Sequence, residues 1–121
     1  FVIEPGPDGF GFVNMERFKA GFAGDTGDAD AAFLRDSQVP INMAIFGDRL
    51  TQAAWRTKPS QAVIAMHDRA IDPRLLRQQA KRIGAKITEV EASHVLFLTQ
   101  PRTVANVIDA TARSLSKAAV R

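Results

Sequence analysis

The sequence contains no cysteine. Disulfide bonds, thiolate zinc sites and cysteine nucleophiles are therefore excluded together. The chain also lacks any apolar stretch near the about 20 residues that a membrane-spanning helix needs, so no membrane partner is expected. Its basic residues are scattered, whereas a nucleic-acid-binding protein would carry them as a stripe or a clustered face. No nucleic-acid partner is expected on that ground.

The composition that remains is typical of a globular domain. The chain has 121 residues, of which 45% are hydrophobic and 24% are charged, and its formal net charge is +3. This length suffices for one modest domain with a core, and the hydrophobic content argues against disorder. No secretory signal is visible, and the localisation is left open.

Residues 1–50 lack a convincing strand pattern. Residues 1–14 are dense in glycine and proline, which predicts loop with short extended pieces. The spacing of Met15, Phe18 and Phe22 then predicts one apolar face of a short helix. We therefore expect short helices with aromatic side chains in this half of the chain.

Two further short helices are predicted before residue 50. Asp28 or Asp30 could cap a helix that runs to Leu34, since a carboxylate can accept hydrogen bonds from the free amides of a first turn. Pro40 could open another helix over residues 41–46.

The second half begins with strand and helix signals in direct succession. Residues 61–66 form an apolar run without alternation, which predicts a strand buried on both faces. Asp72 before Pro73 predicts a capped helix start, and Gly84 stands where a left-handed helix end belongs.

A second strand and a final helix are predicted next. The strand is expected over residues 86–92. The helix opens near Pro101 and carries an apolar stripe made by Val104, Val107, Ile108, Thr111 and Leu115. The order strand, helix, strand, helix predicts a βαβ unit with parallel strands and a right-handed crossover.

Asp68 and His94 are the candidate site residues. Asp68 follows the first predicted strand and His94 follows the second. Adjacent parallel strands lie about 4.8 Å apart, so the two residues can meet at the sheet edge where ligands collect. Singly, each could be an ordinary loop residue. Together they predict an acid–histidine pair, in which the carboxylate orients the imidazole and one ring nitrogen acts as general base.

The other titratable residues near Asp68 have simpler explanations. Asp72 directly precedes the helix-opening proline and is assigned to capping. His67 should point to the opposite side from Asp68 if strand geometry persists, and we interpret it as structural. No HxH, HxxxH or HExxH spacing links the two histidines, so no metal site is predicted.

The sequence supplies no obvious nucleophile for such a pair. No serine stands in a G-x-S-x-G elbow, and there is no HGGG-type oxyanion segment. Ser93 adjoins His94, but neighbours along an extended chain diverge, which makes it a poor candidate. The other serines are Ser37, Ser60, Ser114 and Ser116.

From Trp55 onward, the chain resembles the carboxyl-terminal part of an α/β-hydrolase. It is most similar to the bacterial esterase-like branch related to methyl-ester carboxylesterases and plant methylesterases. The family pattern is a strand ending in G-x-x-D-x-x-I-P, then a helix, a strand, and a small residue before S-H. Asp72 is inserted before the proline here, and the matching residues are Ala65, Asp68, Ile71, Pro73, Ala92, Ser93 and His94.

This resemblance implies a fold and a division of the chain. The expected fold is α/β: the carboxyl-terminal portion of an α/β-hydrolase, a parallel βαβα unit, preceded by short cap helices. Residues 1–54 resemble the helical cap (lid) segment, and residues 55–121 the carboxyl-terminal part of the core. Asp68 would be the triad acid and His94 the triad base.

The resemblance also implies where the nucleophile lies. Family members carry serine, acid and histidine in that chain order, which would place the serine upstream of Phe1 or on another chain. We therefore expect a fragment or nicked product whose partner is the N-terminal part of the same hydrolase.

The expected activity is hydrolysis of a small carboxylic ester without a cofactor. A haloperoxidase- or dehalogenase-like hydrolase and a non-catalytic ligand-binding protein on the same scaffold are the alternatives. Aromatic and methionine side chains of the first segment could line an apolar pocket or form plain core: Met15, Phe18, Phe22, Phe33, Met43 and Phe46.

Overall fold

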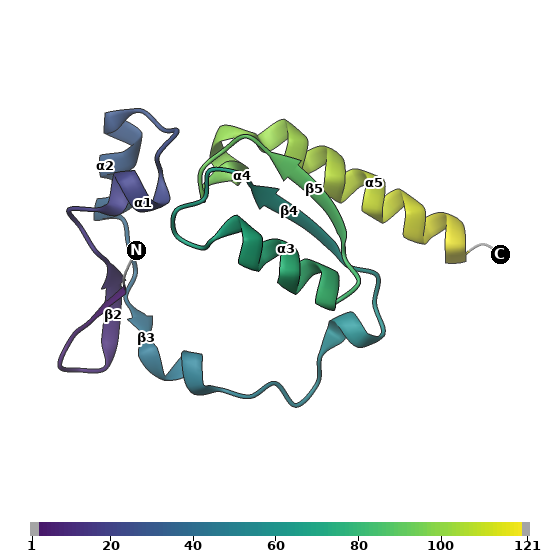
Figure 1. Cartoon of the computed structure of the whole chain (residues 1–121), viewed down its shortest axis with the longest axis horizontal. Helices are drawn as coiled ribbons and strands as arrows, with labels where there is room; N and C mark the ends of the chain where they lie inside the picture. The colour runs from purple at the N-terminus through teal and green to yellow at the C-terminus, as the bar shows by residue number, and fades with distance from the viewer. Residues whose placement is uncertain (1–2, 120–121) are drawn as a thin grey trace.

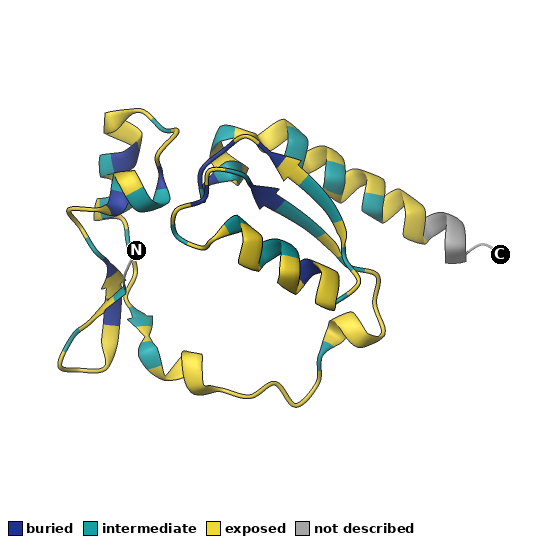
Figure 2. Ribbon diagram, in the orientation of Figure 1, coloured by how far each residue is buried: buried dark blue, intermediate teal, exposed yellow. Residues whose placement is uncertain are grey.

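The computed structural model describes the backbone of residues 3–119 and the side chains of residues 3–115 (Figure 1). An antiparallel sheet and two helices form the N-terminal part, and a parallel strand pair flanked by helices forms the rest. A long exposed connection over residues 43–60 joins them (Figure 2).

The N-terminal sheet consists of three short strands in a segment whose sequence carries no convincing strand pattern. Strand β1 (Ile3–Pro5) pairs antiparallel with β2 (Phe10–Val13), and β2 pairs antiparallel with β3 (Ile41–Asn42). The strands are two to four residues long, too short for alternation to be recognised in the sequence. They are held together by pairing with each other rather than by local propensity.

A tight turn between β1 and β2 explains the glycine-rich composition of this segment. Gly9 has a φ of 81°, in the left-handed region that glycine enters without steric cost. The Asp8 side chain accepts a hydrogen bond of 3.1 Å from the Phe10 amide, as turn aspartates commonly do.

Two helices follow, and the second is not capped as expected. Helix α1 (Phe18–Phe22) confirms the first predicted helix. Helix α2 (Asp28–Asp36) has Gly27 at its N-cap, with no side-chain cap bond. Asp28 and Asp30 lie instead in the first turn, where their charges still favour the helix dipole. The predicted capping role of these two residues was therefore wrong.

The third predicted helix is confirmed only in part. Residues 41 and 42 form strand β3, and a 3₁₀ helix η1 (Met43–Gly47) follows. The Asn42 side chain caps it by accepting a 3.0 Å hydrogen bond from the Ala44 amide. A second 3₁₀ turn, η2 (Ala54–Arg56), precedes the parallel strands.

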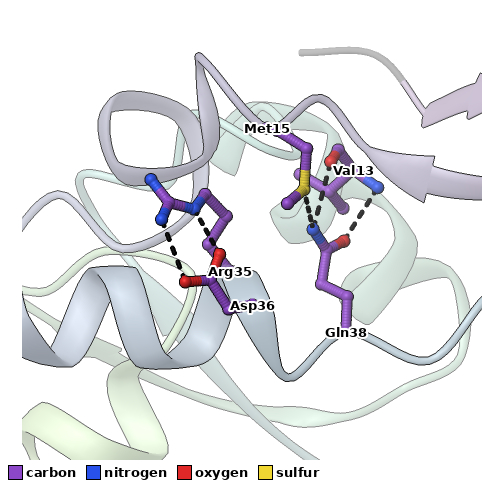
Figure 3. Close-up of polar contacts among 5 residues, drawn as sticks. All are labelled: Val13, Met15, Arg35, Asp36 and Gln38. Carbon is purple, nitrogen blue, oxygen red and sulfur yellow. Dashed lines mark hydrogen bonds and ion pairs between the residues drawn. The ribbon is translucent and has the colours of Figure 1, made fainter.

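The end of α2 is tied to the sheet by a side chain (Figure 3). Gln38 accepts a 2.9 Å hydrogen bond from the Val13 amide and donates a 3.2 Å bond to the Val13 carbonyl. It thus satisfies both backbone groups of a strand residue, as a neighbouring strand would. The nearby Arg35–Asp36 ion pair, also drawn in Figure 3, is exposed and contributes little.

The predicted βαβ unit is confirmed. Strand β4 (Gln61–Ala65) and β5 (Lys86–Val90) pair in parallel from Gln61↔Lys86 to Ala65↔Val90. Helix α3 (Pro73–Arg82) joins them. Figure 1 shows α3 on one side of the strands and α5 (Pro101–Ala119) on the other, after the short α4 (Leu96–Thr99). Both faces of the strand pair are thus covered, as a parallel sheet requires.

The predicted ends of α3 are also confirmed. The Asp72 side chain accepts a 2.8 Å hydrogen bond from the Arg74 amide, with Pro73 in the first turn. Gly84 follows the helix with a φ of 67°. A cap of this kind is typically worth about 1 kcal/mol.

The stripe predicted on α5 is only partly covered. Val104, Val107 and Thr111 are half-buried, whereas Ile108 and Leu115 are exposed. No described helix is long and apolar enough to cross a membrane.

The core contains two apolar clusters. Ala65, Val90 and Ala92 form one at the end of the parallel strands, with Val63 and Leu96 packed against it. The other joins residues of the N-terminal part to one residue of the second half, Val95, which is 1% exposed. Its remaining buried members are Val13, Phe18, Ala23 and Ala31. Val95 therefore packs the segment after β5 against the N-terminal part.

Candidate active site

Asp68 and His94 come together at the carboxyl ends of the two parallel strands. Backbone pairing continues beyond the strands: the Met66 amide donates to the Val90 carbonyl at 2.8 Å, and the His67 amide to the Ala92 carbonyl at 3.0 Å. The two chains therefore leave the sheet side by side. The Asp68 and His94 side chains meet directly beyond this point.

The contact between them is a hydrogen bond with defined atoms. His94 Nδ1 lies 2.8 Å from Asp68 Oδ2. The Asp68 side chain is 3% exposed and that of His94 is 29% exposed. A buried carboxylate on Nδ1 fixes the ring orientation and leaves Nε2 as the nitrogen available for proton transfer.

The loop after β4 holds Asp68 in place. Its other carboxylate oxygen, Oδ1, accepts hydrogen bonds from the Ala70 amide at 2.8 Å and the Ile71 amide at 2.9 Å. Asp68 therefore has both roles that its sequence position allowed: it stabilises the turn after β4, and it contacts His94. The turn uses one oxygen, and the second is left for the imidazole.

The imidazole of His94 also contacts an aromatic ring from the N-terminal part. The centroids of the Phe22 and His94 rings are 4.4 Å apart, with the planes tilted by 43°. Phe22 in turn lies 5.2 Å from Phe18, between centroids. Helix α1 thus reaches the histidine, although the two are far apart in the sequence.

His94 lines a largely apolar pocket of about 660 Å³ between the N-terminal sheet and the loop after β4. That volume suits a small organic ligand. The only described charged or titratable side chain in its lining is His94; the others are Ile3, Val13, Phe22, Gln38, Val39, Ile41, Met43, Phe46, Ala70 and Ile71.

The α/β-hydrolase family model matches residues 2–107 of the chain. This chain belongs to the α/β-hydrolase family. No curated protein and no solved structure matches it significantly. Family membership indicates a hydrolase and confirms the superfamily predicted from the sequence, whereas the esterase branch stays a prediction.

The hydrolase chain uses its other titratable residues near β4 differently from Asp68. Asp72 caps α3 and forms an ion pair with Arg74, whose hydrogen bonds lower the pKa of the Asp72 carboxyl. His67 is exposed and pairs with Glu91 rather than with Asp68. Neither residue joins the Asp68–His94 pair.

The aromatic and methionine side chains of residues 1–54 that were candidates for a pocket lie in three different places: the pocket, the core and the surface. Phe22, Met43 and Phe46 line the pocket that contains His94. Phe18 is buried in the core, and the exposed Met15 and Phe33 lie away from this pocket.

Asp25 is a residue near the site that was missed in the sequence. It accepts hydrogen bonds from the hydroxyls of Ser93 and Thr99, which flank His94 in the chain. Asp25 is exposed, and its partial desolvation opposes ionisation, but the hydrogen bonds from Ser93 and Thr99 outweigh this effect and lower the pKa of Asp25. No sequence signal could have found this contact, because Asp25 sits in a polar break typical of any loop.

The described residues of the hydrolase chain contain no group of three or more potential metal-binding side chains. His94 and Asp68 are occupied with each other, and His67 has Glu91. The contact of Asp68 with Nδ1 leaves the other ring nitrogen of His94 available for proton transfer.

Proposed function

We propose that the chain carries the acid and the histidine of a serine hydrolase that acts on small carboxylic esters. The observation that supports this most is the 2.8 Å bond between buried Asp68 and His94 Nδ1, beside an apolar pocket. A carboxylate, an imidazole and an adjoining apolar pocket are features that acyl transfer by a serine uses besides the serine itself.

The chemistry follows from the two ring nitrogens. Nε2 of His94 would accept the proton of the attacking serine and then donate it to the departing alcohol. Asp68 would keep Nδ1 protonated and stabilise the imidazolium that forms in each step. Water would then attack the acyl-enzyme with the same histidine as general base.

The nucleophilic serine would be supplied by the N-terminal part of the same hydrolase, upstream or as a second chain. In support of this, Ser93 donates its hydroxyl hydrogen bond to Asp25 rather than to His94. Within the described residues, β4 forms a sheet with β5 alone. The buried Ile64 and Ala65 of β4 are typical of a strand inside a larger parallel sheet, which the upstream part of the hydrolase would complete.

The pocket supports a small, apolar substrate portion. The lining of Phe22, Ile71, Met43 and their neighbours would surround an acyl or alcohol group of a few carbon atoms. Because the described residues of the lining include no lysine or arginine, an anionic substrate group would gain no permanent ionic partner there.

The test is hydrolysis of a short-chain p-nitrophenyl ester by the assembled hydrolase, meaning this chain together with the N-terminal part that would carry the serine. We expect H94A and D68N each to lower kcat/KM by about 10⁴-fold, the typical cost of losing such a group. H67A and D72N are the matched controls, since both residues lie close by in the chain but outside the pair. Unchanged kcat/KM in H94A or in D68N would overturn the assignment.

A further inference from the structure

The carboxylate of Asp25, in the N-terminal part, forms hydrogen bonds with the segment that bears His94. Asp25 lies between α1 and α2. Its Oδ1 accepts the hydrogen bond of the Ser93 hydroxyl, and its Oδ2 accepts that of the Thr99 hydroxyl at 2.7 Å. One side chain thus contacts the chain on both sides of the histidine.

The geometry of this segment makes the contact relevant to His94. Ser93, directly before the histidine, is 4% exposed, and Thr99 ends helix α4. Between them, Val95 is buried in the N-terminal core cluster. The backbone that carries His94 is therefore held by contacts with the N-terminal part as well as by its pairing with the chain after β4, whereas Asp68 contacts the ring itself.

The carboxylate is suited to this task at neutral pH. Asp25 is an exposed residue. Partial desolvation opposes its ionisation, but hydrogen bonds from the Ser93 side chain, the Thr99 side chain and the Ser93 backbone together lower the pKa of Asp25. Hydrogen bonds to an ionised group are stronger than those between neutral groups. The charged and titratable side chains in the two pockets beside Asp25 are Glu16, Lys19, Asp30, His67 and Arg69.

We propose that Asp25 is a positioning residue, which holds the Ser93–Thr99 segment so that His94 stays aligned for proton transfer. This inference rests on the proposed function of His94. It assigns the N-terminal segment a part in catalysis beyond lining the pocket. His94 would then be aligned only when the N-terminal segment is packed against residues 93–99.

Loss of the carboxylate should affect the chemical step more than substrate binding. Asp25 is absent from the lining of the pocket that contains His94, so its substitution removes no substrate contact directly. A misplacement of about 1 Å can cost about 10²-fold in rate. We expect D25A to lower kcat about 10- to 100-fold while KM changes less than about 3-fold.

The kinetic experiment compares D25A, D25N and D30N in the assembled hydrolase with a short-chain p-nitrophenyl ester. D25N should lie between wild type and D25A, because the amide keeps the shape and can still hydrogen-bond both hydroxyls. Asp30 lines one of the same pockets but makes neither of these bonds, so D30N should retain wild-type kcat. Wild-type kcat in D25A, or a loss of kcat that D30N shares, would overturn the positioning role.

A second measurement uses the 121-residue chain itself and needs no serine. Nuclear magnetic resonance of the His94 ring should show a Nδ1 proton protected by Asp68 in the wild type, and D25A should broaden or lose it. D30N should leave the signal unchanged. An unaltered signal in folded D25A would refute the inference.

The two proposals can fail separately. If H94A keeps full activity, the proposed function fails, whatever Asp25 does. If H94A is inactive and D25A has wild-type kcat and an unaltered His94 signal, only the positioning role fails.

Discussion

Replacing Val95 with alanine should destabilise the chain by about 2 kcal/mol. Val95 is the residue that brings the segment after β5 into the N-terminal core cluster, and it is 1% exposed. The V95A variant removes two methyl groups from that contact without adding a polar atom. The loss should therefore report directly on how firmly the two parts of the molecule are packed together.

The magnitude follows from the buried atoms. Two buried carbon groups at about 0.8 kcal/mol each give about 1.6 kcal/mol, and a residual cavity raises the loss to about 2 kcal/mol. For 121 residues, an unfolding entropy of about 2.1 cal/mol/K per residue gives about 0.25 kcal/mol/K. The expected fall in Tm is then about 8 °C.

The assay is urea and thermal unfolding followed by circular dichroism, with V39A as the matched control. Val39 is 80% exposed, so the same truncation there should cost less than about 0.5 kcal/mol. Equal losses in V95A and V39A would refute the packing of Val95 between the two parts.

Three further predictions concern local features of the fold. D72A should lower the free energy of unfolding by about 1 kcal/mol through loss of the α3 cap, measured in urea. G84A should cost about 1–2 kcal/mol, because an alanine is strained at a φ of 67°, whereas G47A, without a positive φ, should cost less in the same titration. The contribution of Asp25 should be complete above its unfolded pKa of about 3.8 and disappear as the pH falls through its lower folded-state pKa. Unfolding measured from about pH 5 to about pH 2 should accordingly show a flatter acid limb in D25N than in wild type.

Each of these predictions has an outcome that contradicts it. Wild-type stability in D72A would mean that α3 needs no side-chain cap. Equal stability of G84A and G47A would exclude a strained backbone at the end of α3. An acid limb in D25N as steep as that of wild type would mean that other carboxylates dominate the loss of stability at low pH.

Local signals were sufficient for the parallel half of the molecule. The Asp72–Pro73 pair and Gly84 mark the ends of α3 by chemistry that acts within a few residues. The unalternated run over residues 61–66 marks a strand buried on both faces. Because these effects are short-range, the strand order and the edge where Asp68 and His94 meet could be predicted.

The N-terminal part shows where sequence reasoning fails. Its strands are two to four residues long, so their pairing is decided by partners elsewhere in the chain. The turn at Asp8 and Gly9 was the one local hint of a hairpin. Asp28 and Asp30 have side chains that can cap a helix, yet both lie in the first turn of α2, after the N-cap residue Gly27.

The sequence by itself determined the βαβ unit, the capping of α3 and the candidate pair of Asp68 and His94, because each depends on residue type and spacing along a short stretch. Only the tertiary structure decided that Phe22 contacts the imidazole, that Asp25 holds Ser93 and Thr99, and that Val95 packs into the N-terminal core. These contacts join residues some 70 positions apart. The residue pattern of either segment alone does not predict these contacts, because they form only when the two segments pack against each other.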